Sequence, residues 1–221
     1  MINQLYFSTR AQISNVIDIP TRLNAIAEQT LTIEGINGSV TLNIDQNEDA
    51  NTLARNINEL STQTGVNADA VTVLVLKKFN IDSTISFALQ GENSLPILIS
   101  AQVFTQDLTK LAEQLNKFAE NTGVAATVTH SKDQIILRSL YGHNITIANF
   151  SADNPDCQMQ VGAFLDEDED EDVILGTGQK SIIVSGCITF ESHLSFVIQS
   201  NITGKGALIK REIFTIAPRS S

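Results

Sequence analysis

Residues 50–68, ANTLARNINELSTQTGVNA, decide the fold, because a related stretch returns at residues 108–126, LTKLAEQLNKFAENTGVAA. A shift of 58 positions places the Thr-Gly-Val triplet at 64–66 on the same triplet at 122–124. Internal similarity at a fixed spacing indicates a repeated supersecondary unit. We therefore expect two copies of one small structural unit in this chain.

Each copy is predicted to be an amphipathic helix with a defined end. Apolar residues recur at steps of three and four, which puts one apolar stripe on one face of a helix. The stripes are Ala50, Leu53, Ala54, Ile57 and Leu60, then Leu108, Leu111, Ala112, Leu115, Phe118 and Ala119. Gly65 and Gly123 follow the last apolar turn, where glycine can take the left-handed conformation that ends a helix. Asp49 and Asp107 stand at the helix starts, where the helix dipole favours negative charge.

The segments that flank each helix are rich in strand-forming residues. The first hairpin surrounds an Asn-Gly-containing turn at residues 34–39, which is a typical hairpin signal. The predicted strands are residues 30–33, 40–44 and 70–76 in the first unit, and 84–89, 96–99, 126–129 and 134–139 in the second. We therefore predict the α+β class, with tandem small antiparallel sheets that are each crossed by one helix in ββαβ(β) units.

The predicted organisation has five parts. Residues 1–29 are a lead-in, with strand candidates at 3–8 and 13–19 and a short helical candidate at 21–29. The remaining parts are repeat one at 30–82, repeat two at 83–150, an acidic loop or linker at 151–178, and β-rich C-terminal hairpins at 179–221. The last part is predicted to be an all-β meander. It either extends the sheet of repeat two or packs as a third small unit.

Charge excludes several classes of partner. The net charge is −11, with 14 Lys and Arg residues, so a nucleic-acid partner is disfavoured because phosphate binding needs clustered cations. Residues 166–172 are seven consecutive acids, a block that repels itself and is expected to be extended and solvated. No apolar run approaches the roughly 18 residues that span a bilayer, so membrane insertion is not expected.

The combined order of hairpin, helix, Thr-Gly-Val triplet and strand resembles the flagellin IN motif of bacterial flagellins and of some hook-associated and filament-cap proteins. Later segments at 136–147 and 186–198 resemble the strand patterns that follow in flagellins. The residues that carry the resemblance are Ile57, Asn58, Thr64, Gly65, Val66 and Ala68 in the first copy, and Leu115, Asn116, Thr122, Gly123, Val124 and Ala126 in the second. The resemblance implies a structural role for these residues.

The resemblance also implies a place and a set of partners. It implies the surface-exposed outer region of a flagellin-like protein, outside the cell on a bacterial flagellum, with flagellin or other filament subunits as partners. Neither end of the sequence predicts the long helices that form the filament core, so self-polymerisation is not implied. The N-terminus also lacks a secretory signal pattern, and a cytoplasmic location fits that observation equally.

No catalytic, cofactor or metal site is predicted. His130, His143 and His193 are scattered without metal-site spacing, and Cys157 and Cys187 are too few for a disulfide framework. The expectation is therefore a non-enzymatic structural module. Two alternatives stay open: an adhesin or carbohydrate-binding surface module that contacts a glycan or a host, and a hook-associated or filament-cap accessory protein.

Overall fold

The computed structural model describes residues 5–9, 13–15, 26–163, 172–204, 206–209 and 213–216. Strands predominate over helices in this part of the chain. The first half contains β1 (Leu5–Ser8), β2 (Ile13–Asn15), β3 (Gln29–Gly35), β4 (Gly38–Ile44), α1 (Ala50–Glu59), α2 (Ser61–Thr64), β5 (Asn67–Lys77), β6 (Ser83–Gln90) and β7 (Ile97–Val103). The second half contains α3 (Thr109–Asn116), α4 (Ala119–Thr122), β8 (Val124–Val128), β9 (Ile135–Ser139), β10 (Ile145–Ala152), β11 (Met159–Ala163), β12 (Val173–Leu175), β13 (Ile182–Val184), β14 (Cys187–Ser192), β15 (Phe196–Ser200) and β16 (Ile213–Ile216).

Three antiparallel sheets are built from these strands. The four-stranded sheet has the order β16-β15-β3-β4, and the five-stranded sheet has the order β2-β13-β10-β6-β7. The seven-stranded sheet follows the path β1-β14-β5-β11-β12, with β9 added to β5 and β8 added to β9. This architecture agrees with the predicted α+β class.

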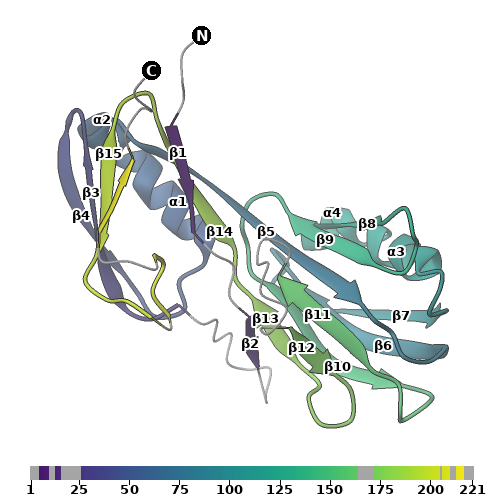
Figure 1. Cartoon of the computed structure of the whole chain (residues 1–221). Helices are drawn as coiled ribbons and strands as arrows, with labels where there is room; N and C mark the ends of the chain where they lie inside the picture. The colour runs from purple at the N-terminus through teal and green to yellow at the C-terminus, as the bar shows by residue number, and fades with distance from the viewer. Residues whose placement is uncertain are drawn as a thin grey trace.

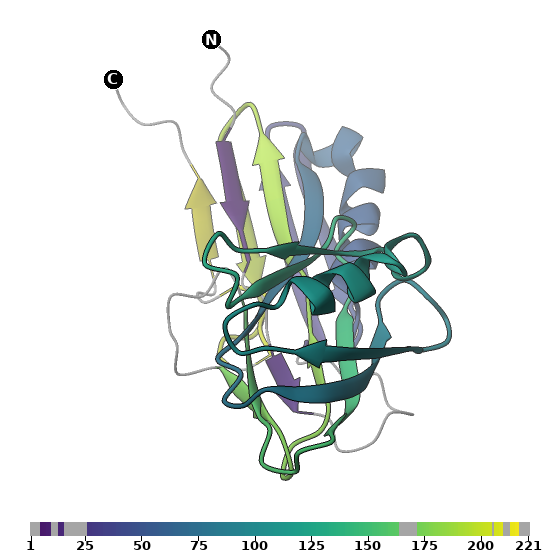
Figure 2. The ribbon, with the colours of Figure 1, turned by 90° about the vertical axis from the view of Figure 1, so that its right-hand side faces the viewer.

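The sheets and helices form two lobes (Figure 1). Lobe one contains the four-stranded sheet with α1 and α2, and lobe two contains the five-stranded sheet with α3, α4, β8 and β9. The view of Figure 2 places lobe two in front of lobe one. Each lobe has its own hydrophobic core, and β5 contributes to both: Ala68 packs in the core of lobe one, while Leu74 and Leu76 pack in that of lobe two.

The predicted small sheet for each unit is not what forms. The β3–β4 hairpin belongs to the four-stranded sheet, whereas β5, the strand after its helix, belongs to the seven-stranded sheet. The β6–β7 hairpin and the later strand β8 are likewise in different sheets. Helix α3 contacts both β7 and β8, so it fills the space between two sheets instead of crossing one. β5 is buried at every position from 72 to 76, which requires cover on both of its faces.

Each predicted helix is interrupted near its end. Leu60 separates α1 from α2, and its N–H bonds to the Ile57 carbonyl at 3.0 Å instead of continuing the α-helical pattern. Phe118 occupies the same place in the second copy, where its N–H bonds to the Leu115 carbonyl at 3.1 Å. Both breaks therefore arise from a tightened i to i−3 turn before the glycine.

The C-terminal strands do not form a meander. β13 pairs with β10 and β2, β14 pairs with β1 and β5, and β15 pairs with β3 and β16. Consecutive strands β13, β14 and β15 therefore lie in three different sheets. This arrangement ties the C-terminal part of the chain to both lobes.

The predicted linker also contains strands. β11 and β12 lie within residues 151–178, and β11 pairs with β5. The sequence signal for β11 is the pair of apolar residues Met159 and Val161 at alternate positions, and both are buried. The acids at 166–171 lie outside the described residues. The last acid, Asp172, has a side chain only 7% exposed and lies 2.7 Å from the Lys77 ammonium, so its predicted solvation is wrong.

The two ends of the chain test further predictions. The predicted lead-in strands are confirmed over Leu5–Ser8 and Ile13–Asn15, as β1 and β2, while the other residues of these predictions, 3, 4 and 16–19, lie outside the described residues. Residues 26–28 of the helical candidate are not helical, and Gln29 begins β3. The rest of that candidate, residues 21–25, lies outside the described residues. Residues 207–209, predicted as a strand, are buried without being strand. Within the described ranges, no helix combines the length and apolar character needed to cross a membrane.

Candidate functional site

The two copies of the helix–glycine–strand junction make the same asparagine contacts. The Asn58 amide donates to the Ala68 carbonyl at 2.7 Å and accepts from the Ala68 N–H at 2.7 Å. The Asn116 amide makes the same two bonds to Ala126, both at 2.8 Å. Each asparagine thus holds the strand after the helix by satisfying one backbone donor and one backbone acceptor. We call this pair of bonds the asparagine clamp.

The threonine of the triplet joins the helix end to the next strand. The Thr64 hydroxyl donates to the Leu60 carbonyl at 3.3 Å and accepts from the Val66 N–H at 3.2 Å. The Thr122 hydroxyl donates to the Phe118 carbonyl at 2.9 Å and accepts from the Val124 N–H at 3.2 Å. Both threonines are buried, so these bonds replace the solvation that burial removes.

The glycine of each triplet ends its helix in the left-handed conformation that its position predicts. Gly65 has φ 76° and ψ 14°, and Gly123 has φ 65° and ψ 13°. The Gly65 N–H bonds to the Ser61 carbonyl at 2.7 Å, and the Gly123 N–H bonds to the Ala119 carbonyl at 2.9 Å. A side chain at either position would carry the cost of a left-handed backbone.

A second glycine in each copy was missed by the sequence reasoning. Gly35 and Gly91 lie in or beside the hairpin turns, where a Cβ would come within 2.0 Å of the Thr64 carbonyl oxygen and 2.2 Å of the Thr122 carbonyl oxygen. The hairpin and the helix end therefore touch backbone to backbone. The available signal was the recurrence of a glycine at the same place in both turns.

The apolar members of the motif lie in the cores. Ile57, Val66 and Ala68 pack in the core of lobe one, and Leu115, Val124 and Ala126 pack in that of lobe two. The twelve motif residues named from the sequence therefore gather at two equivalent junctions, one in each lobe. Their contacts connect a hairpin, a helix and a strand that lie in different layers.

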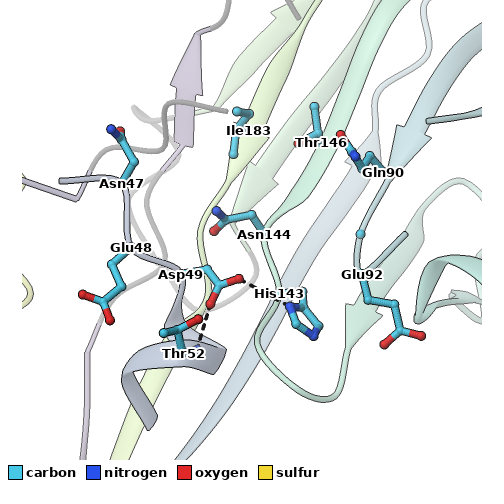
Figure 3. A pocket seen from close by; sticks show the side chains of 11 residues that line it. Asn47, Glu48, Asp49, Thr52, Gln90, Glu92, His143, Asn144, Thr146 and Ile183 are labelled. Atoms are coloured by element: carbon cyan, nitrogen blue, oxygen red, sulfur yellow. Dashed lines mark hydrogen bonds and ion pairs between the residues drawn. The ribbon is translucent and has the colours of Figure 1, made fainter. Parts of the chain in front are cut away.

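A cleft of about 450 Å³ separates the start of α1 from the β6–β7 turn. Figure 3 shows the side chains that line it, with His143 pointing toward Asp49. The Asp49 carboxylate accepts from the Thr52 N–H at 2.8 Å, which caps α1, and its other oxygen lies 3.4 Å from His143 Nδ1. Glu92, from the turn of the second hairpin, lines the same cleft.

The polar groups of the cleft are largely engaged with the protein. Glu48 accepts from the Asp45 N–H at 3.0 Å and from the Asn56 amide at 3.1 Å. Partial burial raises the pKa of the Glu48 carboxyl above its usual value. Across the described ranges, no group of three His, Cys, Asp or Glu side chains is arranged to hold a metal ion. The contact between Asp49 and His143 joins the start of α1 in lobe one to the segment just before β10 in lobe two.

The cysteines and the remaining histidines do not add a second site. Cys157 and Cys187 are both buried, and no disulfide joins them. Burial raises the pKa of the Cys157 thiol, which lowers its thiolate fraction and its reactivity. His130 and His193 are exposed.

Comparison with protein-family models and with curated protein sequences finds no match. Among solved structures, the chain is similar to the flagellar cap protein FliD from Helicobacter pylori, with 11% sequence identity and a TM-score of 0.28. The aligned part covers 80% of this chain and 61% of that chain, so this chain spans less than two thirds of its length. A TM-score at this level does not establish a shared fold.

Proposed function

We propose that this chain is a non-enzymatic structural module of a bacterial flagellum, resembling the surface-exposed outer region of flagellin. The observation that supports the proposal is the doubled motif: two copies of a helix, a Thr-Gly-Val triplet and a strand make the same set of hydrogen bonds. Two matching junctions agree with the repeated unit that the resemblance to the flagellin IN motif implies.

The chemistry of the motif favours scaffolding. Its polar side chains, those of Asn58, Thr64, Asn116 and Thr122, bond to backbone groups of the adjacent helix and strand. A side chain that satisfies buried backbone groups stabilises the fold and is not free to bind a substrate. The motif thus positions elements, and the proposed function depends on the surfaces that it holds in place.

The proposed partners are flagellin or other filament subunits, and the proposed location is outside the cell. The two forms of this proposal differ in where the chain lies on a filament. An outer module of flagellin lies along the filament sides, whereas a hook-associated or cap accessory protein lies at a filament end. We favour the lateral position because the later segments at 136–147 and 186–198 resemble the strand patterns of flagellins, whereas the motif itself occurs in both kinds of protein.

The test is binding of the purified chain to filaments grown from purified bacterial flagellin. Co-sedimentation measures binding, and immunogold electron microscopy of the same sample locates the chain. We expect the chain to pellet with filaments and to label their sides, while an unrelated protein of similar net negative charge stays in the supernatant. Labelling of the ends alone would favour the cap alternative. Retention on immobilised glycans without filament binding would favour the adhesin alternative.

A further inference from the structure

The tip of the β3–β4 hairpin carries an asparagine that is followed by a glycine. Gly35 on β3 pairs with Gly38 on β4, so Ile36 and Asn37 form the turn between them, and Asn37 and Gly38 are both exposed. No other asparagine in the sequence is followed by glycine. The backbone nitrogen after an asparagine can close a five-membered ring on the side-chain carbonyl carbon, and glycine has no Cβ to obstruct that approach.

The side chain of Asn37 is only weakly held. Its amide nitrogen donates to the Thr62 carbonyl at 3.3 Å, which is longer than a typical hydrogen bond. Its amide oxygen has no hydrogen-bond partner among the described residues. The carbonyl carbon of this side chain can therefore turn toward the nitrogen of Gly38 at the loss of one long hydrogen bond.

The equivalent hairpin of lobe two holds its asparagine more firmly. Asn93 corresponds to Asn37, because each lies two positions after the turn glycine. The Asn93 amide oxygen accepts from the Gly91 N–H at 2.8 Å, and its amide nitrogen donates to the Leu95 carbonyl. The next residue is Ser94, whose Cβ crowds the approach of its backbone nitrogen. The two hairpins thus present the same residue in a reactive and in a protected setting.

We propose that Asn37 is a site of spontaneous deamidation, with Gly38 as the source of the attacking nitrogen. This nitrogen forms a bond to Cγ of Asn37, and the bond from Cγ to the side-chain nitrogen breaks. The side-chain nitrogen leaves as ammonia and carries away the proton that the Gly38 nitrogen loses, so the step needs no oxidant or reductant. Water then opens the succinimide ring at either of its two carbonyls, which gives aspartate or isoaspartate.

The reaction changes the contact between the hairpin tip and the end of α2. The Asn37 N–H bonds to the Thr64 carbonyl at 3.4 Å, and its side chain bonds to the Thr62 carbonyl. A carboxylate has no N–H to donate, so the product loses the second bond and sets a negative charge against a carbonyl oxygen. Isoaspartate also lengthens the backbone of the turn by one atom. The deamidated tip is therefore expected to loosen from the junction of lobe one.

The first experiment follows the purified full chain during storage at neutral and at mildly alkaline pH. Peptide mapping by tandem mass spectrometry measures the replacement of NH2 by OH at each asparagine. Asn37 is expected to convert at least about tenfold faster than Asn93, because two hydrogen bonds must break before Asn93 can react. The rate is expected to rise with pH, because the attacking nitrogen must lose its proton. An unmodified Asn37, or equal rates at the two positions, would overturn the proposal.

The nature of the product tests the route. Opening of a succinimide gives a mixture of aspartate and isoaspartate, whereas direct hydrolysis of the side chain gives aspartate alone. Labelling with an isoaspartyl methyltransferase detects the isoaspartate. We expect label in the peptide that contains Asn37, and aspartate without any isoaspartate there would show that Gly38 does not take part.

Two variants separate the effect of the structure from that of the residue pair. Asn37→Gln moves the amide one carbon further from the backbone and should abolish modification at the tip. Ser94→Gly gives the second hairpin the same Asn-Gly pair, yet Asn93 is expected to stay about tenfold slower than Asn37, because its two hydrogen bonds remain. If Asn93 in this variant reacts as fast as Asn37, the hold on the side chain has no influence and the structural basis of the proposal fails.

The consequence is tested with Asn37→Asp, which carries the charge of the product. Hydrogen exchange at the amide of residue 37 is expected to be about fivefold faster, the effect of one lost hydrogen bond. The Glu92 amide bonds to the Thr122 carbonyl at 2.9 Å in the other hairpin and should exchange as in the wild type. Unchanged exchange at residue 37 would show that the deamidated tip keeps its contact with α2, against this part of the proposal.

Discussion

Lobe one and lobe two contain the same junction in different surroundings. In lobe one, the residue after the turn glycine is Ile36, which is 64% exposed and lies beside Gly65 at a free tip. In lobe two, the equivalent residue is Glu92, which lies beside Gly123 and lines the cleft against the start of α1. The backbone contacts are kept while the side chains at the tip differ. The fold therefore requires the backbone contacts of the junction, whereas the side chain at the hairpin tip depends on what surrounds it in each lobe.

The largest effects are expected where the two lobes are most alike, at the turn glycines. Gly35→Ala and Gly91→Ala should each lower the free energy of unfolding by about 3 kcal/mol, because the new Cβ meets a backbone carbonyl that cannot rotate away. Urea unfolding measures the change. Gly178→Ala is the control, since a Cβ there has nothing within 4 Å. Equal midpoints for Gly35→Ala and Gly178→Ala would contradict the close approach of hairpin and helix end.

The asparagine clamps come next in expected size. Asn58→Ala or Asn116→Ala leaves an N–H and a carbonyl of the following strand without their partner, at a cost of about 2 kcal/mol each. The double variant should lose the sum, because the clamps lie in different lobes and share no partner. Asn43→Ala, at an exposed position of β4, is expected to change stability by less than about 0.5 kcal/mol.

Hydrogen exchange sharpens this second comparison. Removal of Asn58 should speed exchange at the Ala68 amide without changing the Ala126 amide, and removal of Asn116 should do the reverse. If either variant deprotects both amides to the same extent, the junctions do not act independently. In that case the additivity expected in urea would fail as well.

The capping glycines should have a smaller effect. Gly65→Ala and Gly123→Ala each force a Cβ into the left-handed region, at a cost of about 1 kcal/mol. Asparagine tolerates this conformation better, so Gly65→Asn and Gly123→Asn should recover part of the loss in thermal unfolding. A Cβ at Gly123 would also meet the flexible Glu92 side chain at 2.7 Å. Glu92→Ala in the Gly123→Ala background tests whether that contact adds to the cost.

The smallest expected difference concerns the pKa of two carboxyl groups, which the fold raises in lobe one and lowers in lobe two. Partial burial raises the pKa of the Glu48 carboxyl near the start of α1. Hydrogen bonds from the Thr109 side chain and N–H lower the pKa of the Asp107 carboxyl near the start of α3. A carbon-13 NMR titration of the side-chain carboxyls should therefore show Glu48 protonating well before Asp107 as pH falls. Reversed order would contradict the surroundings described for both groups.

These two pKa shifts also determine whether each carboxyl stabilises the folded protein at low pH or at high pH. Because the pKa of Asp107 is depressed by folding, its contribution is present above the unfolded value of about 3.9 and is lost as pH falls through the folded value. Glu48 behaves in the opposite way. Its contribution is present below the unfolded value of about 4.3 and is lost as pH rises through the raised folded value. Glu48→Gln should remove this second dependence.

Local structure was predictable from the sequence because local patterns determine it. The hairpin turns, the apolar helix stripes and the left-handed Gly65 and Gly123 all depend on residues within a few positions of one another. Pairing between distant strands has no such signal. Phe190 on β14 lies opposite Ala68 on β5, and neither segment contains a sequence pattern that identifies the other as its pairing partner. The sequence therefore predicted the elements of each unit, while the sharing of sheets between units required the structure.

The candidate site shows the same division. The importance of Asn58 and Thr64 was predictable from their recurrence at Asn116 and Thr122, but the bonds that they make were not. An asparagine on a helix has many backbone partners within reach, and the packing of the next strand selects one of them. Gly35 and Gly91 were missed because glycine in a turn has an obvious local explanation, and the contact that excludes a Cβ comes from a segment some thirty positions away.

The passage of β5 through both cores has a mechanical consequence. Force that draws the two lobes apart pulls on β5, the strand that both lobes contain. β14 lies antiparallel along the same strand from Asn67 to Val71, so a pull along β5 loads these hydrogen bonds in shear, all at once, instead of opening them one after another. The two lobes should for this reason resist force as a single body and give way together.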